Sequence, residues 1–296
     1  MRIDCVSVCY CLHIAKDVLW VEQFDIGFVI LTWNSEQYIE KCIESIFGLN
    51  NFHVAICVVD NGSKDRTVQI LKELQEKSVP QKMELDIICL RENKGTTVSR
   101  NLGIKKILSR IKNLCILDSD TVINQNAVQD MLQVLYENKK NGIVGPRMET
   151  SAGLEQQSGR NIPSLKVKLL KVMPIKTLRK KGEAMERVEH LGRNVIPVGY
   201  IMSACWFIRA EVVREIGLLD EKIFYAPEDV EYCLRAWKNG YRVLLNYNAK
   251  IIHEWQRLSR KKLFSKHNWE HIKGLAYLYT KYGIWFSKEK YDCLIQ

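Results

Sequence analysis

The chain has 296 residues, of which 47% are hydrophobic and 26% charged, a composition that supports a packed core and excludes an intrinsically disordered protein. Its formal net charge of +10 favours anionic partners, namely nucleotide phosphates, acidic lipids or nucleic acid. No apolar stretch approaches the roughly 18 to 20 residues that would span a bilayer, so we do not expect an integral membrane protein. Asp4 and Asp17 interrupt the mildly apolar N-terminal segment, and we expect no signal peptide there.

The ten cysteines are scattered along the chain, which is typical of a protein in the reducing cytoplasm rather than of a disulfide scaffold. Cys57, Cys89 and Cys115 lie within runs of Val, Ile and Leu, and we expect them to be small buried hydrophobic side chains. Four potential metal ligands lie near the N-terminus: Cys5, Cys9, Cys11 and His13. Their spacing fits no zinc pattern, so we do not expect a metal site there.

Strand-like and helical segments alternate through the first 150 residues. Five apolar runs have the length of buried strands: 26–31, 54–60, 85–90, 114–118 and 142–145. Four segments with helical periodicity lie between them: 35–47, 65–75, 97–109 and 125–137. This alternation predicts an α/β fold with a mainly parallel central sheet flanked by helices. In such sheets ligands bind beyond the carboxyl ends of the strands.

Polar residues follow each of the first four predicted strands. They are Thr32–Asn34, Asp60–Asp65, Asn93–Gly95 and Asp118–Asp120. Each group alone has an ordinary structural explanation, as a turn, a helix cap or the end of a strand. Their occurrence at one edge of the same predicted sheet favours a binding site.

Asp118 and Asp120 place two carboxylates at the point where an apolar strand gives way to a loop. Carboxylate oxygens are ligands that Mg²⁺ and Mn²⁺ prefer, and these ions complete their coordination with substrate phosphates. An ion held there would neutralise charge on a departing diphosphate. His253 follows a strand-like run at 242–252 and is a candidate third ligand, with a purely structural histidine as the alternative.

Glu228 and Asp229 occupy the start of a predicted helix that ends at Gly240. The helix dipole stabilises acidic side chains at this position and lowers their pKa. A general base for a sugar hydroxyl would therefore require burial to raise its pKa. Helix stabilisation and catalysis both remain open for this pair on the sequence alone.

Taken in order, these segments resemble the family 2 glycosyltransferases, which have a GT-A fold. The segments that carry the resemblance are Thr32–Asn34, Val59–Asp65, Asn93–Gly95 with Arg100 and Asn101, Asp118–Asp120, Pro227–Glu231 with Arg235 and Gly240, and His253. The resemblance covers about residues 24–255. The bacterial rhamnosyl- and galactofuranosyltransferases are the most similar branch, because of the acidic helix start and the final histidine.

The resemblance implies a metal-dependent, inverting transfer from a nucleotide-sugar donor linked to UDP or dTDP. It implies a donor-binding set of Thr32, Asn34, Asp60, Asn93, Gly95, Arg100 and Asp118. Asp60 would bind the nucleobase, Thr32 would lie near the nucleoside, and Asp118 near the ribose or diphosphate. Asp118, Asp120 and His253 would hold Mg²⁺ or Mn²⁺. Asp229 would take the proton of the acceptor hydroxyl, and Glu228 would orient the acceptor.

The resemblance also divides the chain. It implies an N-terminal extension at 1–23, a GT-A domain at 24–255 with a basic insertion at 151–195, and a C-terminal helical segment at 256–296. In the insertion, Leu165–Pro174 mixes apolar residues with lysines and has no acidic residue, which is typical of a membrane-surface contact. A flap over the acceptor is the alternative, and both remain open. A second basic run lies at 257–266.

We therefore expect a cytoplasmic enzyme that acts at the inner face of the cell membrane on a glycan or lipid-linked acceptor, in cell-surface polysaccharide biosynthesis. A basic nucleic-acid-binding protein is less consistent with the sequence, because no known nucleic-acid module is present. A sugar-nucleotide nucleotidyltransferase would have a glycine-rich, basic loop after the first strand, where this chain has Thr32–Ser35. A catalytically inactive binding protein is disfavoured because every expected acidic position is filled.

Overall fold

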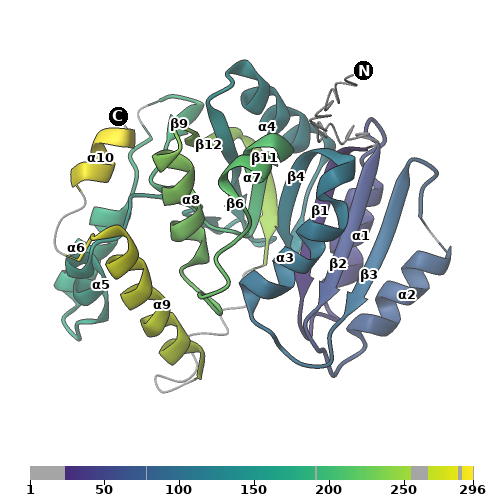
Figure 1. Cartoon of the computed structure of the whole chain (residues 1–296), viewed down its shortest axis with the longest axis horizontal. Helices are drawn as coiled ribbons and strands as arrows, with labels where there is room; N and C mark the ends of the chain where they lie inside the picture. Colours follow the sequence, from purple (N-terminus) through teal and green to yellow (C-terminus); the bar gives the residue numbers. More distant parts are fainter. Residues whose placement is uncertain (1–23, 78, 191, 255–265, 286–288, 296) are drawn as a thin grey trace, which may run out of the picture.

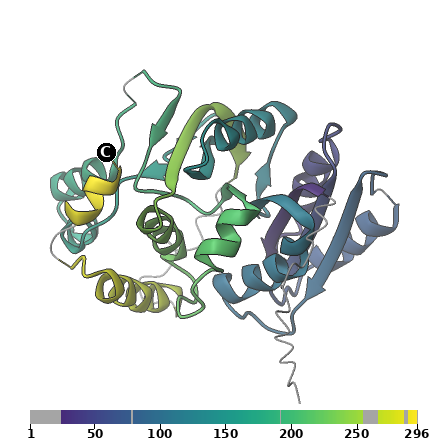
Figure 2. The ribbon, with the colours of Figure 1, turned by 45° about the horizontal axis from the view of Figure 1, so that its top comes forward.

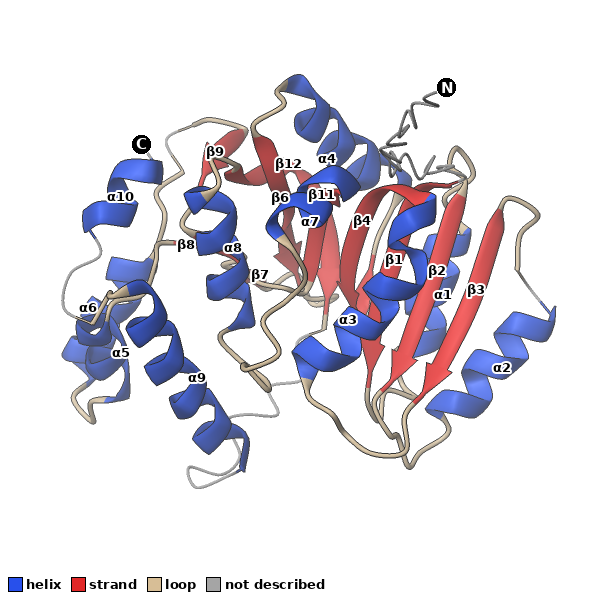
Figure 3. Cartoon of the chain, in the orientation of Figure 1, coloured by secondary structure: helices blue, strands red, loops and turns tan. Residues whose placement is uncertain are grey.

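The computed structural model describes residues 24–77, 79–190, 192–254, 266–285 and 289–295 (Figure 1). Helices cover a central sheet, and a smaller group of helices lies to one side of it (Figure 3). The expectations for the N-terminal extension with its Cys5–His13 cluster, and for most of the basic run at 257–266, fall on residues outside these ranges. Within them, no helix is long and apolar enough to cross a membrane.

Four parallel strands form one half of the sheet, in the spatial order β3-β2-β1-β4. They are Phe24–Thr32 (β1), Val54–Asp60 (β2), Met83–Cys89 (β3) and Ile111–Asp118 (β4). Each contains most of one predicted apolar run, so this half of the predicted sheet is confirmed. The arrows of all four point the same way, and their carboxyl ends form one edge (Figure 3).

The other half of the sheet is mixed, with the order β4-β11-β6-β12-β5. Its strands are Cys205–Arg209 (β11), Asn141–Glu149 (β6), Arg242–His253 (β12) and Thr121–Val122 (β5). β11 runs antiparallel to both of its neighbours, whereas β12 is parallel to β6. The predicted strands do not include β11. Four further short strands complete the structure: Glu155–Gln156 (β7), Gly159–Arg160 (β8), Val195–Pro197 (β9) and Tyr200–Ile201 (β10).

The sheet separates two apolar cores, because side chains of each strand alternate between its faces. In β1, Phe28 and Ile30 belong to one core and Val29 to the other. One face is covered by Ile39–Phe47 (α1), Thr67–Lys77 (α2) and Gln125–Glu137 (α4). The other is covered by Thr96–Ile107 (α3) with the 3₁₀ turn Leu108–Arg110, Ala210–Ile216 (α7) and Glu228–Lys238 (α8). Gly103 lets α3 approach β1, since a Cβ there would lie 2.7 Å from Val29.

Two expectations about individual residues are wrong. The helix predicted from Ser35 begins at Ile39, because the Ser35 carbonyl accepts the N–H of Tyr38 in a turn and the Ser35 N–H donates to Thr67 at 2.8 Å. Cys89 is exposed rather than buried, since β3 is the edge strand of the sheet, although Cys57 and Cys115 are buried as expected.

A helical unit lies beside the sheet at the end where α8 is found (Figures 1 and 2). It consists of Leu165–Val172 (α5), Lys176–Glu186 (α6), Lys266–Tyr282 (α9) and Glu289–Ile295 (α10). Ser164 caps α5 by accepting the Val167 N–H. α9 packs against α8, where the Tyr282 hydroxyl donates to Glu231 at 2.8 Å and Lys281 pairs with the same carboxylate. α9 thus borders the first turns of α8, and we call α5 and α6 together the helical insertion.

Candidate active site

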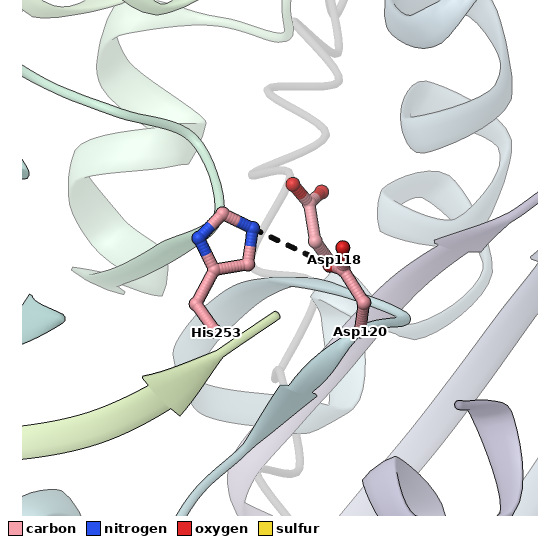
Figure 4. A group of neighbouring side chains, drawn as sticks. All are labelled: Asp118, Asp120 and His253. Atoms are coloured by element: carbon pink, nitrogen blue, oxygen red, sulfur yellow. Dashed lines mark ion pairs between the residues drawn. The ribbon is translucent and has the colours of Figure 1, made fainter. Parts of the chain in front are cut away.

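The three predicted metal ligands lie together at the carboxyl edge of the sheet (Figure 4). Asp118 ends β4, Asp120 lies in the turn to β5, and His253 ends β12. β5 pairs with β12 so that Thr121 lies opposite His253, and the Glu254 N–H donates to the Asp120 carbonyl at 3.0 Å. Strand pairing therefore brings together residues that are more than 130 positions apart in the sequence.

One ligand atom from each of these side chains lies within 4.8 Å of the others. His253 Nε2 is 3.4 Å from Asp120 Oδ1, and both side chains are largely buried. Although burial opposes a charged imidazole, the hydrogen bond to Asp120 and its negative charge raise the pKa of His253. Two carboxylates and an imidazole form a donor set that Mn²⁺ accepts readily, and Mg²⁺ with added water and phosphate oxygens. The residues present therefore fit a divalent cation.

Gln156 holds His253 in place from the side away from the aspartates. Its amide Nε2 donates to the His253 carbonyl at 2.7 Å, and its Oε1 lies 2.7 Å from His253 Nδ1. Because an amide oxygen only accepts, Nδ1 carries a proton and donates to Gln156. The neutral imidazole then has the lone pair of Nε2 on the side of the aspartates, where it could bind an ion, whereas the charged form would donate from Nε2 to Asp120. Gln156 was not predicted, because no local pattern distinguishes it from other glutamines. A partner that fixes the tautomer of a ligand histidine is common in metal sites.

We expect Gln156→Leu to weaken Mn²⁺ binding about 10- to 100-fold, because the substitution frees the His253 ring to rotate and to change tautomer. The affinity is measured by titrating the protein with Mn²⁺ and following the free ion by electron paramagnetic resonance. Gln157→Leu is the matched control, since it makes the same change one residue along the chain. Equal affinities of the two variants would contradict this role for Gln156.

Arg100 connects the aspartates to the start of α8. Its guanidinium is fully buried, with Nη2 2.6 Å from Asp118 Oδ1 and Nη1 3.1 Å from Glu228 Oε1. Nη2 also donates to the Ser203 carbonyl at 3.2 Å, and the Ser203 hydroxyl donates to Glu228 at 2.8 Å. Arg100 thus fixes the separation of two carboxylates that are more than 100 positions apart in the sequence. The resemblance implied only that Arg100 belongs to the donor-binding set.

Glu228 and Asp229 begin α8, as predicted. Burial and the neighbouring Asp229 charge raise the pKa of Glu228 to about 7, despite the opposing charge of Arg100. Burial also raises the pKa of Asp229, against its hydrogen bond from the Val230 N–H and the charges of Lys168 and Arg160. The effect of burial thus outweighs that of the helix start, which by itself would lower both values.

Two buried polar atoms without a partner among the described residues lie at the ends of β1 and β2. They are Thr32 Oγ1 and Asp60 Oδ1. The strands pair so that Thr32 is directly opposite Asp60. Asp60 Oδ2 accepts the N–H groups of Gly62 and Ser63 at 3.2 and 3.0 Å. Because an unmade hydrogen bond in a buried site is costly, these two atoms are suited to a polar ligand such as a nucleobase.

The other predicted donor residues shape the loops around this position. Asn34 has a φ of 52° and its side chain accepts the Lys64 N–H at 2.8 Å. Asn93 accepts the N–H of Gly95 at 2.9 Å. Gly95 has a φ of 88°, and a Cβ there would lie 2.4 Å from the Phe224 carbonyl, so only glycine fits. These loops come to the same edge as Asp118, and the Gly95 loop contacts the segment that leads to α8.

A separate cavity of about 900 Å³ lies between β7, α6 and β12, lined among others by Arg147, Lys180 and Tyr247. The described residues that line this cavity include none of the predicted site residues. Among these lining residues, Gln156 forms a hydrogen bond to a predicted site residue, His253. The candidate active site is therefore the open carboxyl edge of the sheet rather than this cavity.

Residues 28–217 match the family described as "Glycosyl transferase family 2". The low-salt glycan biosynthesis hexosyltransferase Agl10 of Haloferax volcanii is 23% identical over 79% of this chain and 69% of its own length. The dTDP-rhamnosyl transferase RfbF of Shigella flexneri is 23% identical over 76% of this chain and 67% of its own. The poly-beta-1,6-N-acetyl-D-glucosamine synthase of Staphylococcus aureus is 24% identical over 49% of this chain, but this covers only 34% of that enzyme.

Solved structures share the fold at low sequence identity. The mannosyltransferase PcManGT of Pyrobaculum calidifontis, in complex with GDP-Man and Mn²⁺, superposes with a TM-score of 0.59 at 14% identity, over 88% of this chain and 64% of that one. S. aureus TarS 1-349 in complex with UDP-GlcNAc superposes with a TM-score of 0.57 at 16% identity, over 92% of this chain and 70% of that one. At such identities the likeness establishes the fold, which is GT-A. Because the family match spans more than half of the chain, the protein belongs to glycosyl transferase family 2 and is a glycosyltransferase.

Proposed function

We propose that this glycosyltransferase moves a sugar, with inversion, from a UDP- or dTDP-linked donor to a hydroxyl group of a glycan or lipid-linked acceptor. The observation that carries the proposal is the link Asp118–Arg100–Glu228, which holds a candidate metal site at a fixed separation from the acidic start of α8. Donor and acceptor would meet between these two groups of carboxylates.

The donor side is proposed as follows. Thr32 Oγ1 and Asp60 Oδ1, both buried and unpartnered, would bind the nucleobase. Asp118, Asp120 and His253 would hold Mg²⁺ or Mn²⁺. When bound, the ion supplies positive charge that stabilises the departing diphosphate. Asn34, Asn93 and Gly95 would form the loops around the nucleotide. The name of the dTDP-rhamnosyl transferase RfbF and the UDP-GlcNAc bound to TarS support a dTDP- or UDP-linked donor, and the GDP-Man bound to PcManGT supports a nucleotide sugar more generally.

On the acceptor side, Asp229 would be the general base and Glu228 would orient the acceptor. Asp229 takes the proton of the acceptor hydroxyl while the hydroxyl oxygen forms a bond to the anomeric carbon. The bond between that carbon and the phosphate oxygen breaks on the opposite face, and the nucleoside diphosphate leaves with the electron pair. The raised pKa of Asp229 makes it a stronger base than an exposed aspartate, which supports this assignment.

The place of action is proposed to be the inner face of the cell membrane. α5 has lysines at 166, 168 and 171 and no acidic residue, and more basic residues follow in α6 at 176 and 179–181. Leu169 and Ile175, in and after α5, are exposed. Exposed apolar side chains among cations are typical of a surface that contacts anionic lipid.

The proposed reaction is tested by donor hydrolysis. The protein is incubated with UDP- and dTDP-sugars with and without Mn²⁺, and release of the nucleoside diphosphate is measured. We expect slow, metal-dependent release from one donor, reduced at least about a hundredfold in Asp120→Ala, because charge stabilisation by a bound ion is worth several kcal/mol. Asp130→Ala on α4 is the control, and its rate should equal that of the wild type.

A second incubation, with a nucleoside triphosphate and a sugar 1-phosphate in place of the nucleotide sugars, tests the alternative class of enzyme. A sugar-nucleotide nucleotidyltransferase would form pyrophosphate from a nucleoside triphosphate and a sugar 1-phosphate. Pyrophosphate formation from these substrates, without binding of UDP or dTDP in the presence of Mn²⁺, would contradict the proposed transfer reaction.

A further inference from the structure

A group of three cations gathers around one buried carboxylate between β8 and the helical insertion. Lys171 Nζ lies 2.5 Å and Arg160 Nη1 3.4 Å from Glu186 Oε2, while Lys168 Nζ lies 3.0 Å from Oε1. The Glu186 side chain is only 2% exposed, and the three cations are about a quarter exposed or less. We call these four residues the cationic cluster. None of them was predicted as a site residue.

The cationic cluster has more positive charge than Glu186 neutralises. Although burial opposes its ionisation, the charges of Lys168 and Lys171 hold the pKa of Glu186 below its usual range, so the carboxylate is ionised. Within the cluster, three cations and one anion leave a surplus of two positive charges, of which the charge of the neighbouring Asp229 offsets one. Burial lowers the pKa of Lys171, which is the expected effect of partly desolvating a cation in this setting. An added anion would stabilise such a surplus.

The cationic cluster lies next to the proposed general base. Arg160 Nη2 lies 3.9 Å from Met202 Sδ, and the next residue, Ser203, donates to Glu228 at 2.8 Å, so the cluster borders the start of α8. The charges of Lys168 and Arg160 also oppose the burial that raises the pKa of Asp229. The surplus charge therefore lies near the place where the proposed function puts the acceptor.

The same helices carry most of the exposed large apolar side chains. Nine such side chains are exposed in the described part of the chain, and six of them lie in the helical insertion or α9: Leu169, Met173, Ile175, Met185, Trp269 and Ile272. This concentration of exposed apolar side chains in one group of helices suits an apolar partner. An amphiphile with an anionic head and an apolar tail would match both the cations and these side chains.

We propose that Arg160, Lys168 and Lys171 bind a phosphate group of the acceptor, and that the exposed apolar side chains of α5, α6 and α9 hold a lipid attached to that phosphate. This inference rests on the proposed function and specifies its acceptor. Phosphate suits the cationic cluster because it has up to two negative charges and several acceptor oxygens. The guanidinium of Arg160 and the two lysines can donate to these oxygens while they also pair with Glu186. The acceptor hydroxyl would then lie near Asp229.

The proposal is tested by calorimetric titration of the full chain, first saturated with Mg²⁺ and with UDP or dTDP, whichever binds, so that the donor position is filled. The three probes are decyl phosphate below its micelle concentration, decyl glucoside and inorganic phosphate. We expect decyl phosphate to bind and Lys168→Met to weaken it about tenfold, since one charge-assisted hydrogen bond is lost. Lys41→Met, which changes an exposed lysine on α1, is the control and should change the affinity less than about twofold. Glu186→Gln should increase the affinity, a gain that misfolding cannot produce.

The phosphate probes also separate two sources of the same group. Tighter binding of decyl phosphate than of inorganic phosphate supports a lipid-linked phosphate, whereas equal binding supports a soluble phosphorylated glycan and removes the lipid. Decyl glucoside binding as tightly as decyl phosphate, or equal losses in Lys168→Met and Lys41→Met, would overturn the phosphate site. If neither UDP nor dTDP bound in the first step, the proposed function would fail instead.

Discussion

Replacing Asp229 by asparagine should reduce the rate of sugar transfer about 10²- to 10⁴-fold, the usual contribution of a general base. Asparagine has nearly the same shape, so its side chain can still accept the Val230 N–H that now bonds to Asp229 at 2.8 Å. It cannot accept the proton of the acceptor hydroxyl. Transfer is measured with a labelled donor, and donor binding by titration with UDP and Mn²⁺, which should be unchanged.

The pH dependence gives this prediction a second readout. Burial raises the pKa of Asp229 above 3.8, and the base must be deprotonated to act. The rate of the wild type should therefore fall as the pH is lowered through this raised pKa, and the fall should begin at higher pH than for an exposed aspartate. The residual activity of Asp229→Asn should lack this acid limb. Retention of full activity or of the limb would exclude Asp229 as the base. Asp130→Asn on α4 serves as the control.

Replacing Arg100 by methionine should lower the free energy of unfolding by about 3 to 5 kcal/mol, the usual cost of removing one partner from a buried ion pair. The reason is that Asp118 and Glu228 both pair with this one guanidinium. Without it, two carboxylates face each other at the buried end of the site. Urea unfolding without metal measures the effect, since a bound ion would compensate the Asp118 charge.

The loss of stability should depend on pH. Burial and the Asp229 charge raise the pKa of Glu228 to about 7 with Arg100 present, and removing the cation raises it further. A protonated Glu228 needs no cation, so the difference between variant and wild type should shrink as the pH is lowered from about 8 to about 6. Arg110→Met is the control, because its pair with Glu84 is largely exposed and is worth at most about 1 kcal/mol. A pH-independent loss would show that Arg100 acts by packing alone.

How far the sequence predicted the fold differs between the two halves of the sheet. The strands β1 to β4 are neighbours in the sheet, and along the chain they alternate with helices. A short window of the sequence therefore shows each of them as an apolar run beside a segment with helical periodicity. β11 comes from a short buried segment far along the chain and inserts between β4 and β6. Its five residues are too few to distinguish a strand from any other apolar segment, and its partners are set by long-range packing.

The candidate site divides in a similar way. The positions of Asp118 and Asp120 at a strand end and of Asp229 at a helix start follow from local signals, and the resemblance to a known family added their proposed roles. The sequence also indicated that Asp229 would need burial for catalysis, but whether burial or the helix start dominates its pKa depends on what surrounds it. Solvent exclusion is a property of the packed molecule, and the structure shows that burial dominates.

The sequence by itself therefore determined the α/β class, the four parallel strands and the acidic residues at the carboxyl edge, since these depend on periodicity and on short spacings. Only the tertiary structure decided how the parts are joined. Gln156 meets His253 across 97 positions, Arg100 meets Glu228 across 128, and Arg160 meets Glu186 across 26. Each of these contacts pairs side chains that no local pattern relates. They form because β7, α3 and α6 pack where the sheet topology places them, and this packing brings polar and charged side chains of separate segments into contact.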